Sequence, residues 1–282
     1  MDNQHSSNIW KKELQQRAEQ EIPKTRLVAN YYRIRRKLAY PLPLRSLSTP
    51  SLKIPDIPDY PWGIWLLWDL EERMNALRWA GYSHQDDTAR SLYRADLEAL
   101  AEWPRYRERP NPDLSAGHAA RLLFQAYQEV PDLGPIRGKV ESAFQRMLTD
   151  ILPEARKLFG AYQKAEDILS LSEPHKVLQN LPWIGTTSLG LAARALNHSD
   201  REEIDTVLSA LLEAFLECRK SGLTEGVAYD GYILDFVLPW LEGLSAVDQE
   251  KFLTHPRLWD MRNQSLYLGV PGNAANVAEI GD

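Results

Sequence analysis

The chain contains a single cysteine, Cys218, among its 282 residues. One cysteine excludes both an internal disulfide and a cysteine-rich metal site. No apolar run reaches the ~18 residues that a membrane-spanning helix needs, so we expect no membrane partner. The N-terminal stretch is polar and lacks the apolar segment of a secretory signal, which predicts a cytoplasmic protein. A sequence trimmed at its start would instead allow a periplasmic or secreted one.

The chain also lacks an excess of basic residues. It has 33 lysines and arginines against 39 acidic residues, a net charge of −6, and this balance argues against a nucleic-acid partner. The six histidines show neither HxxxH nor HxH spacing, so no metal site is expected. The sequence contains no GxGxxG or GxxxxGK loop. We therefore expect neither a metal ion nor a nucleotide cofactor.

Strand signals are almost absent, whereas helical periodicity extends over most of the chain. The segments expected to be helical are 7–38 with a break near Pro23, 60–81, 83–103, 115–128, 139–170 with an interruption at Pro153, 184–196, 201–220, 232–244 and a short one from about residue 247. Short connections between helices predict antiparallel hairpins. We therefore expect an all-α protein, an incomplete α/α toroid of such hairpins. A superhelical repeat array is the alternative, but no clean repeat period supports it.

Prolines concentrate between the first helical segment and the second. They forbid both a helix and a central strand, so this piece should be an extended arm lying over the body. The six prolines are Pro41, Pro43, Pro50, Pro55, Pro58 and Pro61. We therefore divide the chain into N-terminal helices with a Pro-rich arm, residues 1–59, and a toroid domain, residues 60–282, that forms one unit with the arm.

The segment Tyr60–Gly81 is the most strongly periodic and contains four of the nine tryptophans. As a helix it presents two stripes. The aliphatic stripe consists of Leu67, Leu70, Met74 and Leu77. The second stripe consists of Trp65, Trp68, Glu72, Asn75 and Trp79. The aliphatic stripe should be buried. The second either faces a cleft or simply packs, and the usual burial of large aromatic residues favours packing.

Two later segments carry residues suited to chemistry. Asn180 stands just before a helix rich in small residues, whose exposed N–H groups would favour an anion. Tyr229 and Tyr232 are three residues apart in a glycine-bounded acidic loop, and a phenol there suits proton transfer. His118 lies in the first turn of its helix and is a candidate cleft residue. The alternatives are a turn role for Asn180, packing for the tyrosines and capping for His118.

Four short motifs occur together in this chain. Trp68, Glu71 and Arg73 form W-x-x-E-x-R, N-L-P-W-I-G begins at Asn180, E-G-x-x-Y-D-G-Y ends at Tyr232, and the sequence ends in A-E-I-G-D. The combination resembles the helical domain of heparinase II/III-like polysaccharide lyases and related alginate lyases, over most of residues 60–282. The resemblance implies an α/α toroid that binds an acidic polysaccharide and cleaves it by β-elimination.

The resemblance also implies residue roles. Asn180 would neutralise the carboxyl group of a uronate, with help from Arg73 or Arg194. Tyr232, 52 residues later, or Tyr229, 49 residues later, would protonate the leaving oxygen. The residues expected to contact the substrate are Trp65, Trp68, Glu72, Arg73, His118 and Trp183. In that family β-sandwich layers follow the toroid and contribute a histidine, so a C-terminal β-sandwich part is an expected partner of this chain.

Two other functions fit the same sequence. An α/α-barrel glycoside hydrolase would need two carboxylates across a cleft, and Glu72 with Asp230 or Asp235 are the available residues. A non-catalytic binding or scaffold module would use the Pro-rich arm and the aromatic stripe as a protein interface. The lyase hypothesis differs from both because it depends on Asn180 and a tyrosine reaching the same hollow.

Overall fold

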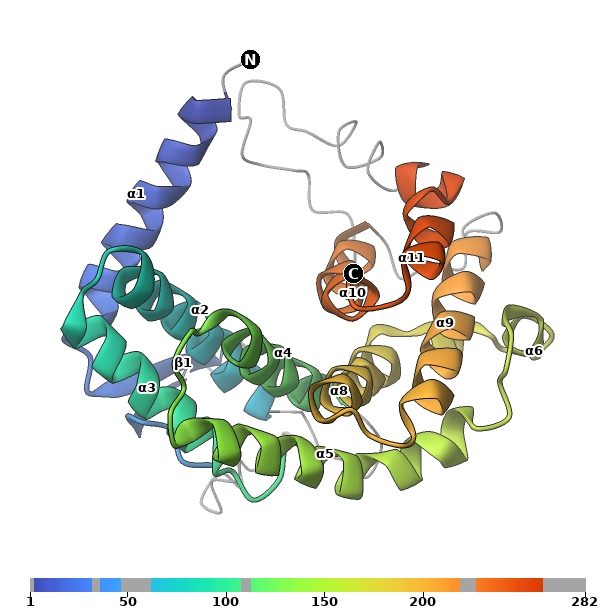
Figure 1. The fold of residues 1–282 in the computed structure, drawn as a ribbon, viewed down its shortest axis with the longest axis horizontal. Coiled ribbons are helices and arrows are strands. Elements are labelled where there is room, and N and C mark those ends of the chain that lie inside the picture. Colours follow the sequence, from blue (N-terminus) through green and yellow to red (C-terminus); the bar gives the residue numbers. More distant parts are fainter. Residues whose placement is uncertain (1–2, 32–35, 47–61, 108–112, 219–226, 261–282) are drawn as a thin grey trace. The chain divides into compact units, whose positions relative to one another are not determined.

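The computed structural model describes residues 3–31, 36–46, 62–107, 113–218 and 227–260 (Figure 1). The described part is all-α apart from one antiparallel hairpin, as the sequence predicts. In chain order the elements are α1 (Asn3–Glu21), β1 (Arg26–Tyr31), β2 (Arg36–Pro41), α2 (Trp62–Ser83), α3 (Asp87–Ala101), α4 (Leu114–Glu129), α5 (Ile136–Phe159), α6 (Ala165–Leu169), α7 (His175–Leu178), α8 (Asn180–Leu196), α9 (Arg201–Cys218), α10 (Val227–Leu241) and α11 (Ala246–Leu253).

The chain divides into two compact units. The first unit comprises Met1–Glu108 and His118–Arg146, and the second comprises Arg109–Gly117 and Met147–Asp282. The N-terminal segment groups with α2 and α3 in the first unit, and the division between the units falls at the start of α4 and inside α5. Among the described residues, no helix is both long and apolar enough to cross a membrane.

The hairpin β1–β2 corrects the prediction of helix up to residue 38. Pro23 follows the last residue of α1, and the segment after it is rich in residues that favour strands. In the register of the hairpin Leu27 faces Tyr40, and both side chains are buried. The pair therefore turns one face of the hairpin inward, and β1 packs against α2. A two-stranded hairpin gains its stability from such packing.

Proline positions explain two further differences. The sequence predicts an interruption at Pro153, yet α5 continues through it. Ile151, Leu152 and Ala155 are buried around the proline, so packing outweighs the cost of about 3 kcal/mol for a proline within a helix. Most of the Pro-rich arm, residues 47–61, lies outside the described residues. In its described part the carbonyl of Leu44 accepts a 2.7 Å bond from the indole N–H of Trp103.

The core of the first unit forms around α2, which packs against α1 and α3. The predicted aliphatic stripe is confirmed, because Leu67, Leu70, Met74 and Leu77 are all at most 1% exposed. The sequence predicts the next helix from residue 83, whereas α3 begins at Asp87; Asp86 caps it by accepting a 2.9 Å bond from the backbone N–H of Ala89. At the start of α4 the carboxylate of Asp113 accepts a 3.3 Å bond from the backbone N–H of Ala116.

A buried guanidinium connects the three helices of this core. Arg73 of α2 is 1% exposed; its Nε donates to Asp96 of α3 at 2.7 Å, and its Nη1 donates to the carbonyl of Glu21 at 2.6 Å. That carbonyl lies at the C-terminal end of α1, where cations interact favourably with the helix dipole. Burial raises the pKa of Asp96, and Arg73 partly offsets this effect. The sequence interpretation of Arg73 as a substrate contact is therefore not retained.

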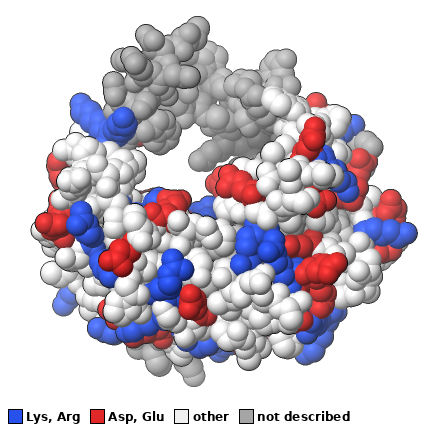
Figure 2. Space-filling model, viewed as in Figure 1, with Lys and Arg blue, Asp and Glu red and all other residues white. Residues whose placement is uncertain are grey.

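The second unit contains the hairpin α8–α9 followed by α10 and α11. Both α9 and α10 pack against α8. Gly190 of α8 permits the close approach, since a Cβ there would lie 2.6 Å from Leu208 of α9 and 2.7 Å from Trp240 of α10. On the face shown in Figure 2, acidic and basic side chains of the described residues are interspersed, in keeping with the nearly balanced composition.

Replacing Arg73 by methionine should lower the free energy of unfolding by about 3–5 kcal/mol, because Asp96 would be left buried without its cation. Urea unfolding followed by circular dichroism measures the change. The matched control is Arg17→Met: Arg17 is 38% exposed, and its loss leaves Lys24 paired with Glu21, so it should cost at most about 1 kcal/mol. Equal losses in the two variants would contradict a structural role for Arg73.

Candidate functional site

Asn180 is the first residue of α8 and is 6% exposed. The helix therefore begins four residues earlier than the sequence predicts, with Pro182 in its first turn, where a proline costs little. The hydroxyls of Thr186, Thr187 and Ser188 donate to carbonyls of the same helix at 2.7, 2.6 and 2.5 Å. Because these polar groups are satisfied internally, α8 can be buried along its length while keeping small side chains.

The hairpin α8–α9 is antiparallel. Near the start of α8, the ring of Trp183 packs edge-to-face on Phe215 near the end of α9, with centroids 4.8 Å apart. In the middle, Gly190 contacts Leu208. The reversal occurs after α8 at Asn197, which adopts left-handed backbone angles that asparagine tolerates well. The C-terminal end of α8 and the N-terminal end of α9 therefore lie together.

The C-terminal end of α10 joins the same place. The indole N–H of Trp240 donates to Asp205 near the start of α9 at 2.7 Å. The carbonyl of Trp240 accepts a hydrogen bond from Arg194 in the last turn of α8. The carbonyl of Gly243 accepts one from Arg201 at 3.4 Å. The C-terminal ends of α8 and α10 therefore adjoin, and the two helices pack against each other (Figure 1).

The candidate amide and phenol belong to the beginnings of these two helices. Gly190 of α8 approaches Trp240 of α10, and Asn180 and Tyr232 stand ten and eight residues before these two positions.

Tyr229 lies on a helix rather than on the predicted loop, because α10 begins at Val227, five residues before the predicted start at Tyr232. Tyr232 is half-buried, and its ring packs edge-to-face on Phe236 with centroids 5.4 Å apart. Asp235 is exposed. The side chains of Tyr229 and Asp230 lie outside the described part. Tyr232 is therefore the better defined of the two candidate phenols.

Two other candidates of the second unit serve its packing. Trp183 is fully buried against Phe215, which leaves none of its ring for a sugar. Arg194 donates to the carbonyl of Trp240 at the C-terminal end of α8, whereas Asn180 lies at the N-terminal end of the same helix. Neither residue is therefore placed to act with Asn180, and neither is retained as a substrate contact.

In the first unit, the candidates Trp68 and His118 belong to one network of side-chain hydrogen bonds. The indole N–H of Trp68 donates to Nε2 of His118 at 3.1 Å, and Nδ1 of His118 lies 2.7 Å from Glu71. Arg121 donates to the other oxygen of Glu71, from Nε at 2.7 Å. This hydrogen-bond network extends from the buried carboxylate of Glu71 to Trp68, whose side chain is 43% exposed.

The hydrogen bonds define the state of His118. An indole N–H can only donate, so Nε2 must be the acceptor and Nδ1 must carry the proton that goes to Glu71. Burial alone raises the pKa of Glu71, but the hydrogen bond from His118 and the guanidinium of Arg121 outweigh it and lower this pKa below its usual value. The carboxylate of Glu71 thus orients the ring of His118, an arrangement that also orients catalytic histidines.

The sequence analysis did not identify Glu71 and Arg121 as members of this hydrogen-bond network. The available signal was spacing, because His118 and Arg121 are three residues apart on one helix face. The sequence analysis named Glu72 instead. Glu72 is exposed and pairs with Arg17 on the surface. Glu72 lies in the first unit, whereas its proposed hydrolase partners, Asp230 and Asp235, lie in the second. The side chain of Trp65 falls outside the described part.

Replacing Glu71 by glutamine should lower the free energy of unfolding at neutral pH by about 1.5–3 kcal/mol, the range for hydrogen bonds to charged groups. Because the folded-state pKa of Glu71 is below 4.5, its contribution is complete above that pH and is lost as the pH falls further. The difference between the two proteins in urea unfolding should therefore shrink in acid. Glu72→Gln, with a 62% exposed side chain, is the neighbouring control. An E71Q deficit that does not change with pH would contradict this account.

The chain was compared with protein-family models, with curated proteins and with solved structures, and none of the three comparisons found a match. No family is therefore shown for this chain. The arguments that follow depend on the residues themselves: the amide of Asn180 and the phenol of Tyr232 on α8 and α10, and the Glu71–His118–Trp68 hydrogen-bond network on α2 and α4.

Proposed function

We propose that this protein binds a uronate-containing polysaccharide and cleaves it by β-elimination. The observation that carries the proposal is the packing of α10 on α8, with Asn180 as the first residue of α8 and Tyr232 near the start of α10. The start of a helix carries free backbone N–H groups, and such groups attract carboxylates. An acidic sugar therefore suits these helix starts better than a neutral one.

The chemistry needs both side chains. Removal of the proton from the carbon next to a carboxylate is difficult until the carboxylate charge is offset by a hydrogen-bond donor. The amide of Asn180 supplies such a donor without accepting the proton. The ionised phenol of Tyr232, or the histidine of the further β-sandwich part, takes this proton as the base. The electron pair then forms a carbon–carbon double bond, and the glycosidic bond to the leaving oxygen breaks. The phenol of Tyr232 gives that oxygen its proton, with Tyr229 as the alternative donor.

The proposal includes a toroidal arrangement of the helical hairpins. What supports it is the antiparallel hairpin α8–α9, since an α/α toroid is built from such hairpins. The proposal also includes a β-sandwich part, in this or another chain, as the source of a further catalytic histidine. Among the described tryptophans, Trp68 is 43% exposed and Trp259 is 50% exposed.

The test is incubation with alginate, heparan sulfate and chondroitin sulfate, while the ultraviolet absorbance of the unsaturated product is followed. Asn180→Ala should lower kcat by about 10²–10³-fold, as for loss of a donor to a developing anion. Tyr232→Phe should lower kcat by about 10²–10⁴-fold, as for loss of an acid–base group. Circular dichroism of each variant verifies that it is folded.

Gln179→Ala and Tyr162→Phe are the matched controls and should leave kcat unchanged. Gln179 precedes Asn180 and makes no side-chain cap, and Tyr162 is a partly exposed phenol of the same unit. Absence of unsaturated product with all three polymers would overturn lyase activity. Retention of polymer on the protein without cleavage would identify a binding module instead. Product formation that both variants leave unchanged would overturn the assignment of the residues.

A further inference from the structure

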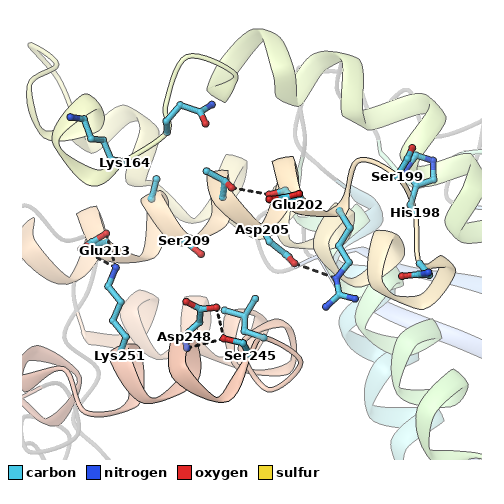
Figure 3. A pocket seen from close by; sticks show the side chains of 16 residues that line it. Lys164, His198, Ser199, Glu202, Asp205, Ser209, Glu213, Ser245, Asp248 and Lys251 are labelled. Carbon is cyan, nitrogen blue, oxygen red and sulfur yellow. Dashed lines mark hydrogen bonds and ion pairs between the residues drawn. The ribbon is translucent and has the colours of Figure 1, made fainter.

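A polar groove of about 740 Å³ lies along α9 in the second unit (Figure 3). Its floor is α9, and its walls come from the segment before α6, the turn after α8 and the start of α11. The neutral hydrogen-bonding side chains that line it are Gln163, Asn197, Ser199, Thr206, Ser209 and Ser245. Neither Asn180 nor Tyr232 lines the groove, so it is separate from the residues of the proposed function.

The floor of the groove is one face of a helix. Arg201, Asp205, Ser209 and Glu213 follow one another at intervals of four residues, so they lie on one stripe of α9. Twelve residues of helix extend for about 18 Å, which is long enough for a short linear oligomer. Ser209 and its neighbour Ala210 contribute small side chains to this floor.

Charges in the groove are nearly balanced, and most have partners within it. Asp205 pairs with Arg201 at 3.4 Å, and Glu213 pairs with Lys251 at 3.3 Å. Asp248 accepts a 2.6 Å hydrogen bond from Ser245. The four carboxylates belong to Glu202, Asp205, Glu213 and Asp248, and the three cations belong to Lys164, Arg201 and Lys251. A polyanion would meet the carboxylates and a polycation would meet the cations, and like charges brought together lower affinity.

The ligand chemistry follows from this mixture of groups. Carboxylates only accept hydrogen bonds and ammonium or guanidinium groups only donate them, whereas a hydroxyl does both. A ligand rich in hydroxyls can therefore pair with every group along the floor without carrying charge. We propose that the groove along α9 binds a neutral oligosaccharide. This proposal is independent of the β-elimination proposed for Asn180 and Tyr232.

A natural reporter lies behind the floor. Trp240 is fully buried, and its indole N–H donates to Asp205, whose side chain lines the groove. A ligand that bonds to Asp205 changes the electron density at the acceptor of this hydrogen bond. The nitrogen–proton resonance of the Trp240 indole, assigned with Trp240→Phe, should therefore shift when the groove is filled.

The experiment is a titration of the ¹⁵N-labelled protein with the neutral tetrasaccharides cellotetraose, maltotetraose and mannotetraose. An alginate tetramer and a glucosamine tetramer serve as the anionic and cationic probes. We expect a saturable shift of the Trp240 indole resonance at millimolar concentration with at least one neutral tetrasaccharide, and none with the charged ones. No shift with any of the three neutral sugars, or a larger shift with a charged tetramer, would overturn the proposal.

Variants localise the binding. Ser209→Phe places a large ring on the floor and should abolish the shift, whereas Ser142→Phe, at an exposed position of α5 outside the groove, should preserve it. If Ser209→Phe does not fold, Glu213→Ala removes a partly exposed floor carboxylate and should weaken binding. Asn180→Ala should leave the shift unchanged, which separates this proposal from lyase activity. Binding that survives both floor variants would place the sugar elsewhere.

Discussion

Polar groups buried on α2 constrain how the first unit can pack. Glu71 and Arg73 are two residues apart in a helix that is otherwise aliphatic on its buried side, and each finds its partners on other helices. A buried charge whose partner is removed costs about 3–5 kcal/mol, a large part of the stability of a domain. Arrangements of the helices that fail to supply these partners are therefore strongly disfavoured. Hydrophobic burial brings the helices together, and the charges select which helices meet.

The second unit satisfies its buried polar groups differently. The hydroxyls of α8 bond to carbonyls of their own helix, so α8 needs no partner helix for them. The side chains of α8 at these positions are small, and Gly190 lets α9 and α10 approach closely. Close approach fixes direction as well as distance, because Arg194, Asp205 and Trp240 bond only when the ends of the three helices coincide.

The second unit carries both proposed sites. Asn180 is the first residue of α8 and Tyr232 lies near the start of α10, and Trp240 connects the C-terminal ends of these helices. The groove along α9 is lined by neither residue, and most of its charges are paired within it. A uronate at Asn180 and Tyr232 and a neutral sugar in the groove are therefore separate proposals.

Local patterns allowed much of the helical structure to be predicted. The aliphatic stripe of α2 follows from periodicity. The β1–β2 hairpin was missed because its helix-like composition outweighed its strand-forming residues, and burial of Leu27 against Tyr40 decides the outcome. Continuation of α5 through Pro153 was missed because the packing that offsets the proline comes from other segments.

The sequence by itself determined that the described chain is helical, that it has no disulfide and that one side of α2 is buried, because these properties depend on composition and on neighbours within a few residues. Only the tertiary structure decided which side chains Arg73, His118 and Trp183 contact. Arg73 pairs with Asp96 of α3, His118 with Glu71 of α2, and Trp183 with Phe215 of α9. These partners lie more than twenty residues away in the sequence, and local periodicity carries no information about which distant side chain will neutralise a buried charge or cover a ring.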